Sequence, residues 1–148
     1  MIFEIKHKIS GKVLFSAKGE SFRSVVETAI KARVSLRDTD MRNADMQCAD
    51  MRNADMRDAD MRGADMRGAN MRGADMQCAD MRGADWDFSC FPLWCGSFNV
   101  KVDMKFIYQM CYHICKLDNG SKEHADIKIK LTEHANKFHR IDECGEIK

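Results

Sequence analysis

The chain has 148 residues, which suits one domain or one compact body with small appendages. Its 24 Lys and Arg side chains nearly balance 23 Asp and Glu, so no global field favours nucleic acid or a membrane surface. Residues 1–34 carry seven basic and three acidic side chains, and residues 35–88 carry eight and twelve. These local imbalances are too small for the dense phosphate neutralisation of nucleic-acid-binding proteins.

The N-terminal segment, residues 1–33, predicts a β-hairpin followed by a helix. Residues 2–6 and 13–17 are rich in aliphatic and aromatic side chains and are joined around Ser10 and Gly11. Ser21 is a suitable N-cap for a helix that runs to about Arg33. We expect this segment to cap the structure that follows it.

The central segment, residues 34–88, has a period of five without one insertion. A degenerate unit, VSLRD, starts at Val34. The following units read TDMRN, ADMQC, ADMRN, ADMRD, ADMRG, ADMRG, ANMRG, ADMQC, ADMRG and ADWDF. A period of five matches neither the ~3.6-residue turn of an α-helix nor the two-residue alternation of a flat strand. It is typical of a chain that turns a corner every five residues.

Four such sides form a coil of twenty residues, and stacked coils pair their backbones as parallel strands do. Each side then offers one small and one large residue to a common interior. The expected interior residues are the repeat alanines and methionines: Ala44, Ala49, Ala54, Ala59, Ala64, Ala69, Ala74, Ala79, Ala84, Met41, Met46, Met51, Met56, Met61, Met66, Met71, Met76 and Met81. The other three positions of each unit are expected to face outward.

These A-D/N-M-x-x units resemble the pentapeptide-repeat family, whose pattern is A-D/N-L-x-x. The resemblance covers residues 34–88 in eleven tandem units, with Met in place of the family's usual Leu. It implies a mainly β fold: a right-handed quadrilateral β-helix of about three coils. Met is similar to Leu in volume, so the interior should still fill.

The C-terminal segment, residues 89–148, predicts an aromatic lid and a helical hairpin that cap the other end of the coil. The five-residue repeat ends after Trp86 and is followed by the aromatic-rich run FSCFPLWCG. Helices are expected over residues 103–117 and 122–138, separated by the turn DNGS. The flanks, FEIKHKISGKVLFSA and PLWCGSFNVKVD, resemble those of pentapeptide-repeat proteins from phage and prophage genomes, which implies a viral origin but no assigned activity.

Cysteine and histidine spacing favours no metal or catalytic site. Cys95, His113 and His139, with Cys144 or Cys90 as a fourth ligand, form the candidate zinc set, but their spacing matches no ligand motif. A Cys95–His113 nucleophile pair lacks a third orienting group. We therefore predict no enzyme activity, no metal and no cofactor.

The cellular compartment and the absence of membrane contact are predicted from the cysteine spacing, the N-terminal sequence and the lack of long apolar runs. Cys48 and Cys78 lie thirty residues apart, on opposite sides of a twenty-residue coil and out of disulfide reach. The chain has no secretory leader pattern and no run of ~18 apolar residues. These observations predict a cytoplasmic protein, in the host cell if it is phage-encoded, without membrane contact.

The candidate binding surface is a pair of arginine ladders. At twenty residues per coil, Arg42, Arg62 and Arg82 stack on one side, and Arg52 and Arg72 stack on another. Such ladders can meet phosphate or an acidic protein surface. The first ladder is neutralised by Asp residues of the same units, whereas Asn70 replaces one Asp beside the second. The alternative interpretation, a solvated intramolecular charge lattice, stays open.

We expect a non-enzymatic interaction protein that binds a host or phage macromolecule, most naturally a protein, through the rigid repeat surface. Nucleic acid is not expected as a direct ligand. Some relatives mimic DNA and bind type II topoisomerases, but ~13 Å of helix at ~4.8 Å per coil is short for such mimicry, unless a homodimer lengthens it. A third hypothesis is an antagonist of host antiviral immunity that blocks an effector or sequesters a nucleotide signal.

Overall fold

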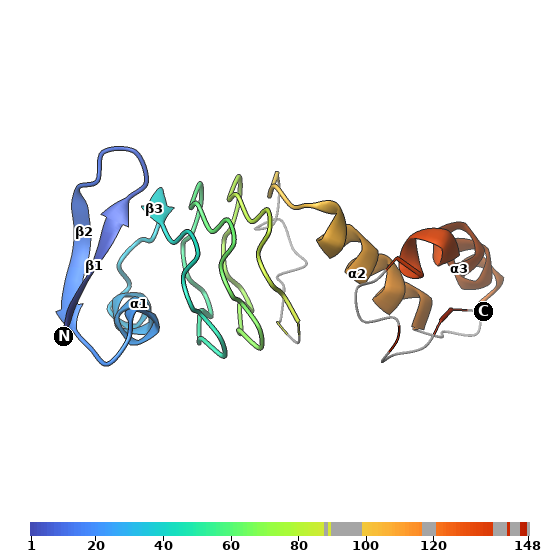
Figure 1. Ribbon diagram of the computed structural model, residues 1–148, viewed down its shortest axis with the longest axis horizontal. Coiled ribbons are helices and arrows are strands. Elements are labelled where there is room, and N and C mark those ends of the chain that lie inside the picture. The colour runs from blue at the N-terminus through green and yellow to red at the C-terminus, as the bar shows by residue number, and fades with distance from the viewer. Residues whose placement is uncertain (88, 90–98, 117–120, 138–141, 143–145, 148) are drawn as a thin grey trace. The chain divides into compact units, whose positions relative to one another are not determined.

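The structure is a computed structural model that describes residues 1–87, 89, 99–116, 121–137, 142 and 146–147. These residues form two compact units, Met1–Lys101 and Val102–Lys148. The first unit contains the N-terminal hairpin, a helix and the repeat, and the second contains two helices (Figure 1). The three-part division predicted from the sequence, at residues 33 and 88, stays a proposal.

The N-terminal hairpin consists of β1 (Ile2–His7) and β2 (Val13–Lys18), paired antiparallel with an irregularity between Ile5 and Lys6. On its other edge β1 pairs antiparallel with β3 (Thr39–Asp40), which belongs to the first coil. The backbone edge of the coil at Thr39 is therefore covered by β1.

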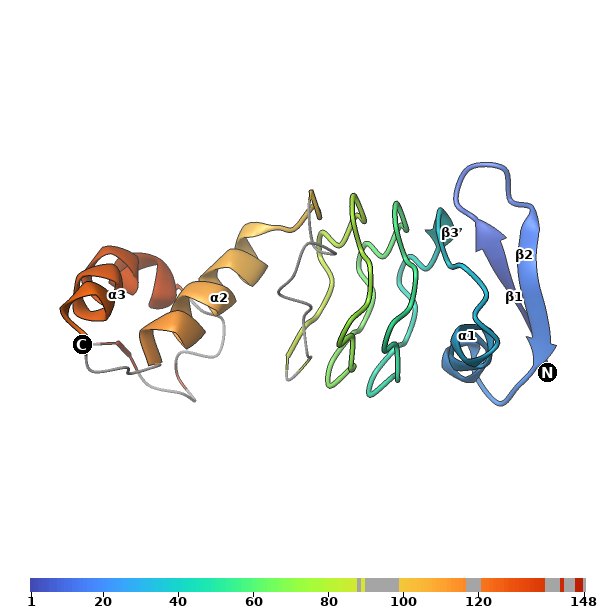
Figure 2. The same ribbon diagram turned by 180° about the vertical axis from the view of Figure 1, so that it is seen from behind.

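Helix α1 (Phe22–Lys31) follows the hairpin and begins at the predicted N-cap. Ser21 and Ser24 form a capping box, in which each side chain bonds the backbone of the other. Val25, Val26 and Ala29 are buried on one face. Figure 2 shows α1 between the hairpin and the first coil, where Arg23 donates to the carbonyl of Gln47.

The repeat forms coils of twenty residues. Parallel backbone bridges join each side to the next coil, as between Asp40 and Asp60 or between Asp45 and Asp65. Three hydrogen bonds join the coils on the first side: Met41 to Asp60, Asn43 to Arg62, and Asp60 to Thr39. The backbone groups of one coil thus find their partners in its neighbours, as in a parallel sheet.

Each corner is a tight turn with a left-handed residue. The N–H of the next Ala donates to the Met carbonyl, for example from Ala64 to Met61 at 3.1 Å. The fifth residue of the unit has positive φ, from 55° at Asn43 to 74° at Gly73. This combination is that of a type II turn, which explains why Asn, Asp and Gly occupy most of these positions.

The interior is the predicted one. All nine repeat methionines are at most 1% exposed. The repeat alanines are buried as well, except Ala44, which is half-buried. Trp86 takes the Met position of the last unit and is buried at 3% exposure. The pattern of one small and one large inward residue per side is confirmed.

Backbone pairing continues beyond the repeat, at Lys101. The N–H of Met81 donates to the Lys101 carbonyl and the Lys101 N–H donates to Ala79, both at 2.8 Å. Lys101 pairs with Asp80, which lies twenty-one residues earlier, one more than the twenty-residue spacing within the repeat. The aromatic run predicted as a lid lies almost entirely outside the described residues.

The second unit contains α2 (Met104–Lys116) and α3 (Lys122–Ala135), close to the helix bounds predicted from the sequence. Its core consists of Cys111, Tyr112, Cys115, Ala135 and Ile147, with Leu131 packed against them. Ser121 caps α3 by accepting from the N–H of His124 at 3.0 Å. Whether these helices also close the end of the coil stays a proposal.

Candidate binding surface

The side of the β-helix that carries Arg42, Arg62 and Arg82 is called the Arg42 face here. Each arginine donates two parallel hydrogen bonds to the Asp two residues before it. Arg62 Nε donates to Asp60 Oδ1 at 2.8 Å, and Arg62 Nη2 donates to Asp60 Oδ2 at 2.7 Å. This fork matches the planar carboxylate and fixes the guanidinium along the surface.

The Arg42 face is connected from coil to coil. Arg42 Nε lies 3.8 Å from Asp60 Oδ2, and Arg62 Nε lies 3.9 Å from Asp80 Oδ2. Each of these two arginines therefore has a carboxylate in its own unit and another in the next coil. The sequence prediction of a neutralised ladder on this side agrees with these contacts, and its three Arg and three Asp leave no net charge.

The forks lower the pKa of the aspartates that they hold. Hydrogen bonds from Arg52 lower the pKa of Asp50 to about 2, and those from Arg57 do the same for Asp55. On the Arg42 face, the arginine hydrogen bonds also lower the pKa of Asp40, Asp60 and Asp80. These carboxylates are bound as anions, which is the opposite of what a general acid needs.

The opposite side, the Arg52 face, consists of Asp50, Arg52, Asn70 and Arg72. Arg52 is held by Asp50 in the same fork, with both distances at 2.7 Å. Asn70 Oδ1 accepts from the backbone N–H of Arg72 at 3.2 Å, as the Asp of other units does. Within the described part of the chain, however, the Arg72 guanidinium has no ion pair.

Arg52 and Arg72 lie in register on adjacent coils, because the Asn53 N–H donates to the Arg72 carbonyl at 3.1 Å. Both side chains are exposed. The structure therefore brings these two predicted residues together and separates them by half a coil from Arg42, Arg62 and Arg82. Two arginines against one carboxylate give the Arg52 face a net positive charge.

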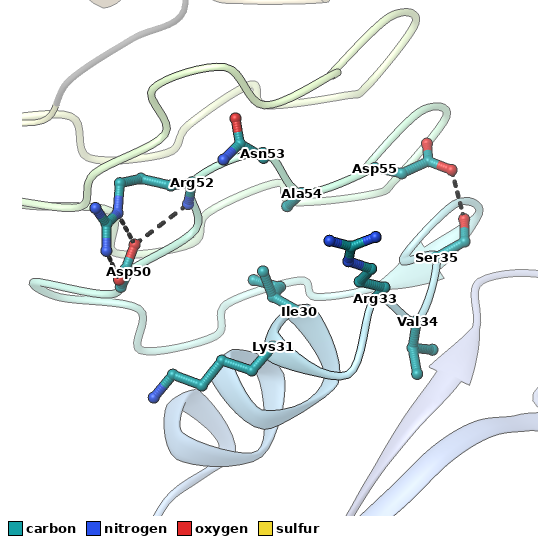
Figure 3. A pocket seen from close by; sticks show the side chains of 10 residues that line it. All are labelled: Ile30, Lys31, Arg33, Val34, Ser35, Asp50, Arg52, Asn53, Ala54 and Asp55. Carbon is teal, nitrogen blue, oxygen red and sulfur yellow. Dashed lines mark hydrogen bonds and ion pairs between the residues drawn. The ribbon is translucent and has the colours of Figure 1, made fainter.

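A pocket of about 680 Å³ lies where the end of α1 meets the Arg52 face (Figure 3). It is lined by Ile30, Lys31, Arg33, Val34, Ser35, Asp50, Arg52, Asn53, Ala54 and Asp55. Sequence reasoning included Arg52 but missed Lys31 and Arg33. For Arg33, the sequence offered one indication: it lies twenty residues before Asn53, which is a turn residue of the repeat.

The candidate metal set is not brought together by the described residues. Cys90, Cys95, His139 and Cys144 lie outside them, and His113 lies on α2. The described residues include no group of three or more His, Cys, Asp or Glu side chains placed to hold a metal. Cys48, Cys78, Cys111 and Cys115 are free thiols.

The geometry of the repeat agrees with a comparison of the chain with known families. Residues 32–58 and 49–85 match the family model described as pentapeptide repeats, in 8 copies. Residues 32–85 are thus similar to pentapeptide repeats. Pentapeptide-repeat proteins fold as right-handed β-helices and are generally non-enzymatic interaction proteins. No curated protein matches the chain.

Two solved pentapeptide-repeat proteins are similar to this chain. One, Rfr23 from the cyanobacterium Cyanothece 51142, is 19% identical over 43% of this chain and 40% of its own, with a TM-score of 0.22. The other, alr5209 from Nostoc Pcc 7120, is 21% identical over 56% of this chain and 96% of its own, with a TM-score of 0.29. The chain thus spans less than half of the Cyanothece protein. In the described residues, no helix combines the length and apolarity needed to cross a membrane.

Proposed function

We propose that this chain is a phage-encoded, non-enzymatic interaction protein of the host cytoplasm, and that it binds an acidic protein surface through its Arg52 face. The single observation that supports this is the unpaired Arg72 guanidinium beside Asn70. On a surface where the other repeat arginines are held by carboxylates, Arg72 is the one that keeps its hydrogen-bond donors available to a partner.

The Arg42 face supports a partner less well. Its arginines already satisfy their Nε and Nη2 donors through Asp40, Asp60 and Asp80. An incoming carboxylate would compete with an intramolecular pair in good geometry, and the net gain would be small. The five arginines predicted from the sequence therefore divide into four that are forked by a carboxylate and one, Arg72, that is not.

Mimicry of nucleic acid has weaker support. The side that carries Asp45, Asp65 and Asp85 is acidic, with Arg67 as its counter-charge, and Arg67 is itself forked by Asp65 at 2.9 and 2.6 Å. With Asp87, this side carries four acidic residues over three coils of ~4.8 Å, a much lower density than one phosphate per ~1.7 Å of DNA axis.

A pull-down from host lysate with matched double variants tests the proposal. The tagged wild-type chain should retain one host protein at defined stoichiometry, read by native mass spectrometry, which also reports a homodimer. The Arg52→Ala/Arg72→Ala variant should lose that protein. The control Arg42→Ala/Arg62→Ala, which removes as many arginines from the other side, should retain it. Equal retention by both variants, or a wild-type chain that emerges alone, would overturn the proposal.

A further inference from the structure

We propose that the pocket between the end of α1 and the Arg52 face binds the phosphate group of a small molecule. This goes beyond the macromolecular role proposed above, because it assigns a ligand to a cavity rather than a partner to a surface. The volume of about 680 Å³ lies within the ~300–1,000 Å³ range of small-molecule sites. The pocket is therefore large enough for an organic phosphate.

The charge around the pocket is positive once its internal pairs are counted. Asp50 is held by Arg52, and Asp55 is held by Arg57 at 2.7 Å. The Ser35 hydroxyl donates to the second oxygen of Asp55, also at 2.7 Å. Both carboxylates that line the pocket thus have their counter-charges or donors in place.

Lys31 and Arg33 are different, because neither has an ion pair within the described residues. Figure 3 shows the Arg33 guanidinium extending from the end of α1 toward the coil that carries Asn53 and Ala54, with Ile30 directed into the same space. At the end of α1, the carbonyls of Ala29 and Ile30 accept from the N–H groups of Val34 and Arg33 at 2.9 Å.

The backbone at Arg33 is set by the end of α1, where Arg33 is the residue after the C-cap Ala32. Its φ is 58°, in the left-handed region that costs a branched or long side chain about 1 kcal/mol or more. The equivalent positions one and two coils later are Asn53 and Gly73, residues that tolerate this conformation. The Schellman arrangement at the end of α1 accounts for this backbone, whereas the Arg33 guanidinium takes no part in it and has no ion pair among the described residues.

The chemistry of the lining favours phosphate bound to an organic group. A guanidinium binds phosphate oxygens with two parallel hydrogen bonds, and a lysine ammonium adds a point charge. Arg52 uses Nε and Nη2 on Asp50, so its Nη1 donors remain for a ligand. Ile30, Val34 and Ala54 offer apolar contact for the remainder of the molecule.

Titration of the ¹⁵N-labelled full-length chain tests this inference. The probes are phenyl phosphate, inorganic phosphate and phenol. Phenyl phosphate should cause saturable amide shifts that are confined to residues 30–35 and 50–55, and phenol should cause none. Saturation by inorganic phosphate with no response to phenyl phosphate would also support a phosphate site, with free phosphate as its ligand. Phenol shifts equal to those of phenyl phosphate, or shifts centred on Arg42 and Arg62, would overturn the inference.

Two variants separate binding from folding. Arg33→Gly removes the guanidinium and relaxes the left-handed backbone, so phenyl phosphate affinity should fall at least about tenfold while the melting temperature holds or rises. Cys48→Gly, which relaxes a residue of φ 55° without loss of charge, is its control and should bind as wild type. Lys31→Gln should weaken binding and Lys12→Gln should not. Unchanged affinity in Arg33→Gly would refute the site.

Discussion

The Arg42 face and the Arg52 face are built from the same repeat and differ in one functional group. Both place an Arg on every coil, in register with the next. On the Arg42 face, Asp40, Asp60 and Asp80 hold every arginine in a fork. On the Arg52 face, an amide replaces one carboxylate at Asn70, and Arg72 is left without an ion pair among the described residues.

Under the proposed function, this difference separates folding from recognition. Asn70 keeps the backbone role of the repeat Asp, since it still accepts from the N–H two residues later. What is lost is the charge, which acts only at the surface. A change of one side-chain atom can therefore release a binding group without disturbing the coil.

The largest effect should come from the interior, and it should be the same beneath both faces. Met61 lies under the Arg42 face and Met71 under the Arg52 face, at 1% and 0% exposure. Met61→Ala and Met71→Ala should each lower the free energy of unfolding by about 2–5 kcal/mol, through lost burial and a residual cavity. Urea denaturation measures both.

A loss that differs by more than the error of extrapolation between the two Met variants would show that the faces differ in packing as well as in charge. Arg62→Ala and Arg72→Ala are the surface controls. Their effects should be smaller, at about 0–1 kcal/mol, because Arg62 has only exposed ion pairs and Arg72 has none among the described residues.

The features that could be predicted from the sequence are those that depend on residues close together in the chain. A period of five without insertion was enough to predict a cornered coil, because no helix or strand accommodates it. The inward Ala and Met residues followed from the same periodicity, and their burial confirms them. Helix α1 was predictable from Ser21 and an apolar face.

The left-handed conformation of the turn residues could have been predicted from the sequence, but it was not. Asn, Asp and Gly fill most of the fifth positions, which is the composition of a type II turn. Arg33 shares that backbone conformation before the first complete unit, at φ 58°. The conformation of Arg33 comes instead from the end of α1, where its N–H donates to the Ile30 carbonyl and the Val34 N–H donates to the Ala29 carbonyl.

The pocket and the register at Lys101 could not be predicted, since both depend on tertiary placement. The pocket exists because α1 ends beside residues 50–55, and no periodicity reports where a helix end meets a coil. Lys101 pairs with Asp80 across a segment that has no repeat pattern. The sequence therefore does not indicate that the two residues are twenty-one apart instead of twenty.

Acid should destabilise the fold through the forked aspartates, three of which lie on the Arg42 face. The pKa of Asp50 is lowered to about 2, and that of Asp40, Asp60 and Asp80 is lowered as well. Between about pH 5 and 2 the unfolded chain takes up protons that the folded chain does not, so the free energy of unfolding falls as pH falls through this range. Urea denaturation at pH 7, 4 and 3 measures the slope.

The pH slope also distinguishes the faces. The triple variant Asp40→Asn/Asp60→Asn/Asp80→Asn should flatten the acid limb more than Asp50→Asn, because it removes three forked carboxylates instead of one. Equal slopes for the two variants would mean that the forks are not the groups that titrate.

The smallest effect should come from repair of the broken ladder. Asn70→Asp restores a carboxylate two residues before Arg72, in the arrangement that gives Arg52 its fork with Asp50. We expect stability to rise by about 0.2–1 kcal/mol at low ionic strength and the gain to fade at about 1 M salt, where the screening length shrinks to ~3 Å. The reciprocal change, Asp60→Asn, should lower stability by a similar amount.

Binding should respond in the opposite direction to stability. In Asn70→Asp the Arg72 guanidinium is engaged by the new carboxylate, so a partner of the Arg52 face should be released faster. Phenyl phosphate affinity in the α1 pocket should change little, because Arg72 does not line it. If Asn70→Asp stabilises the fold and leaves partner binding intact, then Arg72 is not the recognition group, and the free arginine is only a gap in the charge lattice.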